Sequence, residues 1–244
     1  IATITMDNPP VNAHTPAMVE AFIRTIDSLN DMPEVRCAIV TGAGKIFSGG
    51  ADIKGRLKGH AQPGDTAAHL RRTREASYCM IECYKPIIAA VNGPALGAGL
   101  GIAISADIIL ASENAVFGLP EIDVGLMGGA RHTMRIFGHS LARRMILTGY
   151  RVPASELYRL GIIEACTTRE GLMPAAMEIA RNIASKSPAA LRLAKRAIST
   201  VEGMTLRDGY RFEQNLTVEL TQHEDSKEAM RAFLEKRAPN FKDV

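Results

Sequence analysis

The sequence lacks long apolar runs, clustered basic residues and paired cysteine motifs. Its longest apolar stretches have about the length of a strand and are interrupted by Gly, Pro or Asp, which excludes a membrane-spanning helix. Its 29 lysines and arginines are scattered, so the net charge of +3 does not gather into the patch that nucleic-acid-binding surfaces show. We therefore expect neither a membrane nor a nucleic acid as a partner.

The four cysteines, at positions 37, 79, 83 and 166, form no CxxC motif and no Cys/His cluster with zinc spacing. We expect buried or half-buried thiols in a reducing compartment, and no metal site. No signal peptide is visible, which indicates a cytoplasmic protein. The chain opens at Ile1 in what already has the pattern of a strand, so a targeting segment before it stays an open alternative.

Strand and helix patterns alternate along the first part of the chain. Residues 1–6 alternate between apolar and polar, whereas continuous apolar runs typical of buried strands lie within 36–41, 86–91 and 108–111. Thr15 is a suitable N-cap and Pro16 suits the first position of a helix. The apolar face of this helix consists of Met18, Phe22, Ile26 and Leu29. The alternation predicts an α/β fold with crossover connections.

After about residue 153 the pattern becomes helical. Helices are predicted over 169–185, 188–200, 204–222 and 224–236. We therefore divide the chain into an α/β core, residues 1–185, and a helical C-terminal region for trimerisation or covering the site, residues 186–244. Helices that follow a complete core usually bury their apolar faces on something, so oligomerisation is expected.

Two glycine-rich turns follow predicted strands, at residues 47–54 (FSGGADIK) and 91–101 (VNGPALGAGLG). Small residues let a ligand approach the backbone, and a helix that starts there points unpaired N–H groups at it. Two such turns on neighbouring strands would aim two N–H groups at one oxygen, as an enolate or oxyanion requires.

Each turn also has plainer interpretations. Either turn alone is more often a tight strand-to-helix connection. A dinucleotide loop is disfavoured because Ile102 occupies the third glycine position of GxGxxG after Gly97 and Gly99. A phosphate loop at 42–45 is rejected because Ile46 replaces its Ser or Thr.

Four runs, FSGGADIK, KPIIAAVNGPALGAGLGIAISADIILAS, AVFGLPEIDVGL and AFLEKRAPNFKD, together resemble the crotonase (enoyl-CoA hydratase/isomerase) superfamily in order and spacing. With MDNPPVNA near the start, the resemblance covers nearly the whole chain. It implies an α/β fold with a crotonase-like ββα spiral core and a helical C-terminal extension. It also implies an acyl-CoA substrate, no cofactor other than the CoA that the substrate carries, and a homotrimer or a hexamer built from two trimers.

The resemblance assigns roles to individual residues. The backbone N–H groups of Ala51 and Ala98 would bind the thioester oxygen. The positions that would contact the substrate or its CoA moiety are Gly50, Asp52, Ile53, Lys54, Gly97, Phe233 and Lys236, the last two often from a neighbouring subunit. Without the resemblance, Lys54 would be a solvated surface lysine and Phe233 a core residue.

The carboxylates depart from the pattern of the family's hydratases. Those enzymes carry two glutamates that share a water, and the first position is Gly101 here, whereas Glu121 occupies the second. One base suffices for a double-bond shift, so the sequence resembles family isomerases, with weak hydration as another outcome. Asp123 and His132 are weaker acid/base candidates, and Glu121 on position alone would be a solvated cap.

Three further interpretations stay open. The same enolate-stabilising turns would serve decarboxylation or thioester hydrolysis of an acyl-CoA. A non-catalytic CoA-thioester-binding protein is also compatible with the loss of the first glutamate. Gly129 stands where dienoyl isomerases of the family carry an aspartate, so that activity is disfavoured.

Overall fold

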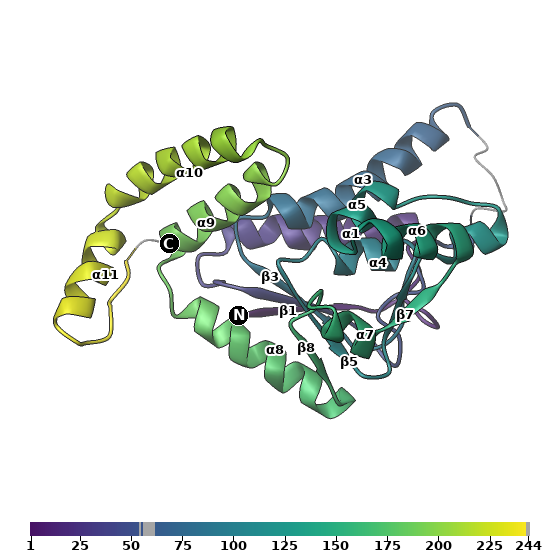
Figure 1. The fold of residues 1–244 in the computed structure, drawn as a ribbon, viewed down its shortest axis with the longest axis horizontal. Coiled ribbons are helices and arrows are strands. Elements are labelled where there is room, and N and C mark those ends of the chain that lie inside the picture. The colour runs from purple at the N-terminus through teal and green to yellow at the C-terminus, as the bar shows by residue number, and fades with distance from the viewer. Residues whose placement is uncertain (54, 56–61, 243–244) are drawn as a thin grey trace.

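The computed structural model of the chain describes residues 1–53, 55 and 62–242 (Figure 1). Its centre is a five-stranded parallel sheet in the order β1-β2-β3-β5-β8. The strands are β1 (Ala2–Met6), β2 (Ala38–Gly42), β3 (Ile87–Val91), β5 (Ile108–Ser112) and β8 (Ala165–Thr167). The predicted α/β class and the strands expected from the four apolar patterns are confirmed.

The central strands are continuous apolar runs because helices cover both faces of the sheet. Every residue of β2 and β3 is buried. Val40 and Ala89 face one hydrophobic cluster, whereas their neighbours Ile39 and Ile88 face a second cluster on the opposite side. Alternate residues therefore enter two cores, as in parallel sheets with crossover helices.

Helix α8 (Arg169–Ala184) covers one face, and α1 (Pro16–Ser28), α3 (Asp65–Glu82) and α4 (Ala98–Ala103) cover the other (Figure 1). Thr15 caps α1 as predicted, since its side chain accepts a hydrogen bond from the Met18 N–H. Val19, Phe22 and Ile26 form the buried face of α1, and Met18 is partly buried beside them.

A second, three-stranded sheet has the order β4-β6-β7. Its strands are β4 (Ala95–Leu96), β6 (Val116–Gly118) and β7 (Arg151–Pro153). Short helical elements follow its strands along the chain: η2 (Pro120–Val124), α5 (Ala130–Ile136) and α6 (His139–Thr148) after β6, and α7 (Ala154–Arg159) after β7. The short helix η1 (Leu29–Asp31) instead follows α1. The sequence did not predict this sheet, since its strands have three residues or fewer and leave no periodic signal.

The predicted C-terminal helices are confirmed as α9 (Pro188–Val201), α10 (Leu206–Thr221) and α11 (Glu224–Leu234). Figure 1 shows α10 and α11 extending beyond the sheet toward one end of the molecule. Several apolar side chains there are exposed: Leu206, Tyr210, Val218, Phe233 and Leu234. The division of the chain after residue 185 stays a prediction.

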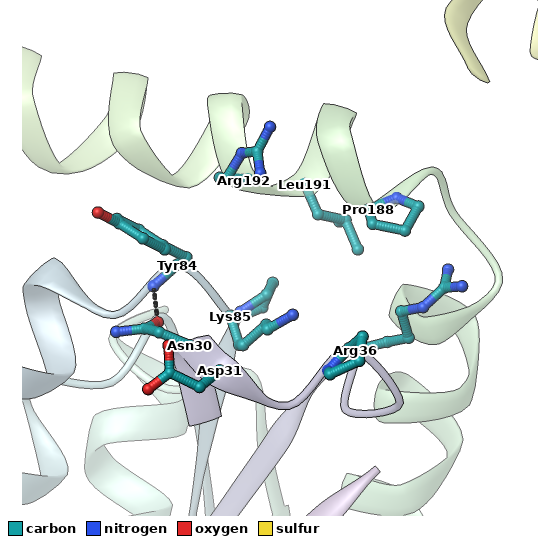
Figure 2. A pocket seen from close by; sticks show the side chains of 10 residues that line it. Asn30, Asp31, Arg36, Tyr84, Lys85, Pro188, Leu191 and Arg192 are labelled. Carbon is teal, nitrogen blue, oxygen red and sulfur yellow. Dashed lines mark hydrogen bonds between the residues drawn. The ribbon is translucent and has the colours of Figure 1, made fainter. Parts of the chain in front are cut away.

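A small hollow of about 110 Å³ lies between the amino ends of β2 and β3 and helix α9 (Figure 2). Arg36, Lys85 and Arg192 line it, and at its edge the Tyr84 N–H donates to Asn30 Oδ1 at 2.8 Å. Burial, with smaller effects from Arg36 and Arg192, lowers the pKa of Lys85. The glycine-rich turns follow the carboxyl ends of these strands, so the hollow lies at the opposite edge of the sheet.

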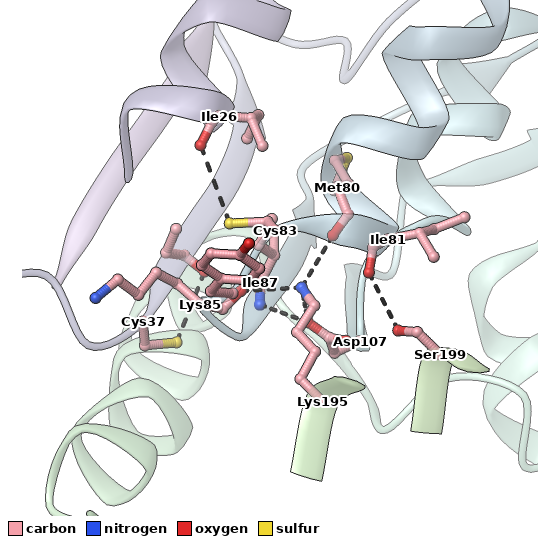
Figure 3. Close-up of polar contacts among 12 residues, drawn as sticks. Ile26, Cys37, Met80, Ile81, Cys83, Lys85, Ile87, Asp107, Lys195 and Ser199 are labelled. Atoms are coloured by element: carbon pink, nitrogen blue, oxygen red, sulfur yellow. Dashed lines mark hydrogen bonds and ion pairs between the residues drawn. The ribbon is translucent and has the colours of Figure 1, made fainter. Parts of the chain in front are cut away.

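Lys195 fastens α9 to the core (Figure 3). Its side chain is 5% exposed and its Nζ lies 2.8 Å from Asp107 Oδ2. The same Nζ donates to the carbonyl oxygens of Met80 and Lys85, each at 2.9 Å. One side chain therefore ties α9 to the end of α3, the turn before β3 and the segment before β5.

The cysteines are free thiols, as predicted: Cys37, Cys79 and Cys83 are buried and Cys166 is half-buried. Burial raises the pKa of Cys37 and of Cys79 to about 12. Among the described residues, no group of three His, Cys, Asp or Glu side chains is arranged to hold a metal ion. No described helix combines the length and apolar character needed to cross a bilayer.

Candidate active site

The first glycine-rich turn is held against the segment before α1. Ser48 is fully buried, and its Oγ donates to the Asn12 carbonyl at 2.8 Å and accepts from the Gly50 N–H at 3.1 Å. The Gly49 N–H donates to the Val11 carbonyl, and the His14 N–H donates to the Gly50 carbonyl, both at 2.8 Å. These bonds fix the backbone that leads into Ala51.

The second turn is bonded to the first through Ser48. The Ser48 N–H donates to the Pro94 carbonyl at 3.1 Å, and the Leu96 N–H donates to the Ser48 carbonyl at 2.9 Å. The Gly97 N–H then donates to the Gly118 carbonyl of β6 at 2.9 Å. Helix α4 begins at the next residue, Ala98, so the Ala98 N–H lies at the N-terminus of a helix.

The two turns meet at Gly50 and Ala98. A Cβ atom built on Gly50 would lie 3.2 Å from the Ala98 nitrogen and 2.5 Å from the Leu96 carbonyl oxygen, and Gly50 has a φ of +88°. A side chain does not fit there, so glycine is required for the two turns to approach. Among the described residues, neither the Ala51 N–H nor the Ala98 N–H has a hydrogen-bond acceptor, and both residues line one pocket.

Glu121 reaches the same place from η2, which follows β6. A Cβ atom on Gly97 would lie 2.6 Å from Glu121 Oε1, so the carboxylate lies directly against the second turn. The Glu121 residue is half-buried. The structure thus brings together one carboxylate and the two N–H groups named from the sequence.

The pocket around these groups has a volume of about 630 Å³. Its walls come from α1, α3, α4, η2 and α5, and apolar side chains such as Val19, Leu100, Leu119 and Met127 form much of the lining. Concave, mostly apolar pockets with a few convergent polar groups are typical of small-molecule sites.

Gly101 leaves open space in this pocket. A Cβ atom built there would have one neighbour within 4 Å among the described residues, Ser77 Oγ of α3 at 3.6 Å. The other acidic residue of the lining, Asp123, is exposed, and its Oδ2 would lie 2.9 Å from a Cβ atom on Gly149. Asp123 therefore packs against Gly149, at the end of α6.

His132 lies in the pocket wall, with its ring centroid 6.1 Å from that of Tyr78 in an edge-on arrangement. Burial lowers the pKa of His132, and the nearby charges of Arg135 and Arg131 lower it further. A neutral imidazole packed against an aromatic ring fits a structural role for His132.

Of the other residues predicted to contact the substrate or CoA, some line the pocket and some do not. Ile53 lines the pocket at 41% exposure, whereas Asp52 does not line it. Lys54 lies outside the described residues. Phe233, 83% exposed on α11, and Lys236, just beyond that helix, do not line the pocket of their own chain. Figure 1 shows α11 far from α4 and α5.

Sequence reasoning missed most polar residues of the pocket lining, among them His14 and Ser77. The Nε2 atom of His14 is buried and has no hydrogen-bond partner in the described part of the chain. A single histidine before a helix N-cap and a serine within an amphipathic helix carry no pattern that distinguishes them from ordinary residues.

The chain resembles known proteins over nearly its whole length. The sequence model "Enoyl-CoA hydratase/isomerase" matches residues 1–244. The chain is 34% identical over 247 residues to 2,3-dehydroadipyl-CoA hydratase of Escherichia coli (strain K12), covering 99% of this chain and 95% of the relative. It is also 34% identical over 238 residues to (7aS)-7a-methyl-1,5-dioxo-2,3,5,6,7,7a-hexahydro-1H-indene-carboxyl-CoA hydrolase of Mycobacterium tuberculosis, covering 97% of this chain and 95% of the relative.

The fold agrees as well. The crystal structure of an enoyl-CoA hydratase from Bacillus anthracis superposes with a TM-score of 0.92 at 32% identity, covering 98% of this chain and 94% of the other. The resemblance to the crotonase superfamily and the fold that it implied are confirmed. The chain is an enzyme that belongs to the enoyl-CoA hydratase/isomerase family.

Proposed function

We propose that this enzyme shifts the double bond of a 3-enoyl-CoA to the 2 position, with Glu121 as the single acid/base. The observation that carries the proposal is one carboxylate against the second glycine turn, with Gly101 in place of a second one. The remaining carboxylate of the described lining, Asp123, packs against Gly149. A mechanism with one proton acceptor fits these carboxylates better than a mechanism that needs two.

In the proposed reaction the thioester oxygen accepts hydrogen bonds from the N–H groups of Ala51 and Ala98. Glu121 removes a proton from C2, and the electrons of that C–H bond delocalise onto the thioester oxygen as a dienolate. The two N–H donors stabilise this charge, and donors of this kind are each worth about 2.7–4 kcal/mol. Glu121 then returns the proton to C4, the double bond lies between C2 and C3, and no atom is gained or lost.

Hydration of a 2-enoyl-CoA is the second candidate. It requires a water that is both held and deprotonated, with a proton delivered to C2. Glu121 would have to perform these steps without a carboxylate at position 101, so we expect slow hydration. Decarboxylation or thioester hydrolysis would use the same enolate-stabilising donors, and the hydrolase name of one relative keeps that alternative in view.

Purified enzyme supplied with 3-enoyl-CoA and, separately, with 2-enoyl-CoA distinguishes these reactions. The proposal expects the first to be converted to 2-enoyl-CoA at least about 100-fold faster than the second is hydrated, given the usual contribution of one acid/base group. Faster hydration would contradict the proposal. Conversion of neither, with acyl-CoA still bound, would favour a non-catalytic binding protein.

We further propose that Phe233 and Lys236 contact the CoA moiety bound to a neighbouring subunit, with Asp52, Ile53 and Lys54 contacting it from the same chain. Phe233 is 83% exposed at the far end of the C-terminal region, as expected of a residue that packs against another copy. A homotrimer or a hexamer would provide that copy. Light scattering tests the assembly, and a monomeric mass would contradict it. The absence of a further cofactor and the cytoplasmic location stay predictions.

A further inference from the structure

His14 lies beside the first of the two N–H donors. Its backbone N–H donates to the Gly50 carbonyl at 2.8 Å, and His14 and Ala51 form a parallel β-bridge. Side chains paired across a bridge project to the same face of the backbone. Both residues line the pocket, so the imidazole stands next to Ala51, where the thioester end of a bound acyl group would lie.

The half-buried His14 has one ring nitrogen without a polar partner. Its Nε2 is buried and accepts or donates no hydrogen bond among the described residues. Burial alone, with no contribution from a neighbouring charge, lowers the pKa of His14 to about 4. A buried polar atom without a partner destabilises a fold, and such an atom beside a binding site calls for a partner that arrives with the ligand.

We propose that His14 determines specificity by hydrogen-bonding through an imidazole nitrogen to a hydroxyl or keto oxygen on the bound acyl chain. The inference rests on the proposed function, because it takes the acyl chain to occupy this pocket. It names the substrate class as an acyl-CoA with an oxygen substituent near the thioester, rather than a plain hydrocarbon chain.

The His14 side chain itself favours a neutral substituent over a carboxylate. A neutral imidazole offers no charge to an anion, and Val19 and Leu100 are apolar members of the same lining. The cations of the lining, Arg72, Arg74, Arg131 and Arg151, come from α3, α5 and β7 and not from the segment of His14. A hydroxyl donates and accepts, so it matches an imidazole nitrogen in either tautomer of the ring.

Binding of unreactive analogues tests the proposal. We would titrate butyryl-CoA, 4-hydroxybutyryl-CoA and acetoacetyl-CoA into the wild type, His14→Leu and His14→Gln by calorimetry. The wild type should bind at least one oxygenated analogue about 10-fold more tightly than butyryl-CoA, which is the scale of one buried hydrogen bond. His14→Leu should abolish that ratio, whereas His14→Gln should restore part of it, because its amide reaches the place of Nε2.

An equal ratio in the wild type and His14→Leu would overturn the proposal, as would a wild type without preference. A merely structural histidine predicts something different: His14→Leu would then lower the melting temperature at neutral pH and leave the ratio intact. The proposal expects the melting temperature of His14→Leu to equal or exceed that of the wild type, because leucine removes an unpartnered polar atom. The affinity ratio is read without turnover, so its failure is distinguishable from failure of the isomerase assay.

Discussion

Glu121 and Gly97 are in direct contact: a Cβ atom on Gly97 would lie 2.6 Å from the Glu121 carboxylate oxygen. Gly97 also has a φ of +55°, a conformation that side chains rarely adopt. The absence of a side chain at position 97 is therefore what lets the carboxylate approach the N-terminus of α4.

Gly97→Ala should cost stability and activity together. Alanine is strained at this φ by about 1–3 kcal/mol, and its methyl group would displace Glu121. The matched control is Gly101→Ala, three residues inside α4 and with room for a methyl group, which should be neutral or stabilising by up to about 1 kcal/mol. Denaturant unfolding of both variants measures this, and equal effects of the two substitutions would contradict the described geometry.

Gly101→Glu should add hydration activity. The space beside Gly101 is bounded by Ser77 Oγ at 3.6 Å, so a longer side chain enters the pocket that holds Glu121. A second carboxylate would help to hold and activate water, and we expect hydration of 2-enoyl-CoA to rise by about 100-fold. Gly101→Gln has the same size without the charge. If it raised hydration equally, the gain would not come from a second acid/base.

The lowered pKa of His14 makes stability depend on pH. Its pKa is about 4 in the folded chain and about 6.5 in an unfolded one, so below pH 6.5 the unfolded state binds a proton that the folded state does not. The free energy of unfolding should therefore fall as the pH falls, by about 2 kcal/mol at pH 5 from this group. His14→Leu should remove that part of the decline. Parallel curves for wild type and variant between pH 7 and 5 would show that His14 is not buried neutral.

Lys195→Met should loosen α9. Removing the lysine leaves Asp107 without its cation and two carbonyl groups without a donor, and since Asp107 is 28% exposed we expect a loss of about 2 kcal/mol. The neighbouring control is Arg196→Met, whose exposed ion pair with Glu219 spans 3.9 Å and is worth about 0.5 kcal/mol or less. Thermal unfolding compares the two variants. Equal losses of stability would mean that the buried contacts of Lys195 stabilise the fold no more than the exposed ion pair of Arg196 does.

The sequence predicted those parts of the fold that leave a local signal. The runs that became β2 and β3 are continuous because both faces are buried, and Thr15 and Pro16 mark the start of α1. The sheet of β4, β6 and β7 gave no such signal, because its short strands pair through contacts between distant segments.

The candidate site was predictable where backbone geometry demands small residues, at Gly50 and Gly97. His14 was not predictable, since its importance depends on an unfilled hydrogen bond that appears only when residues far apart in sequence enclose it. The position of α11 away from the pocket was equally unpredictable, because a terminal helix can fold back or extend.

Turnover of 3-enoyl-CoA by the wild type and by Glu121→Gln is the measurement that bears most directly on the central claim. A single base predicts that the variant binds acyl-CoA as tightly as the wild type does, while conversion to 2-enoyl-CoA falls by about 10²–10⁴-fold. Conversion by Glu121→Gln at the rate of the wild type would remove this carboxylate from the chemistry and contradict the account.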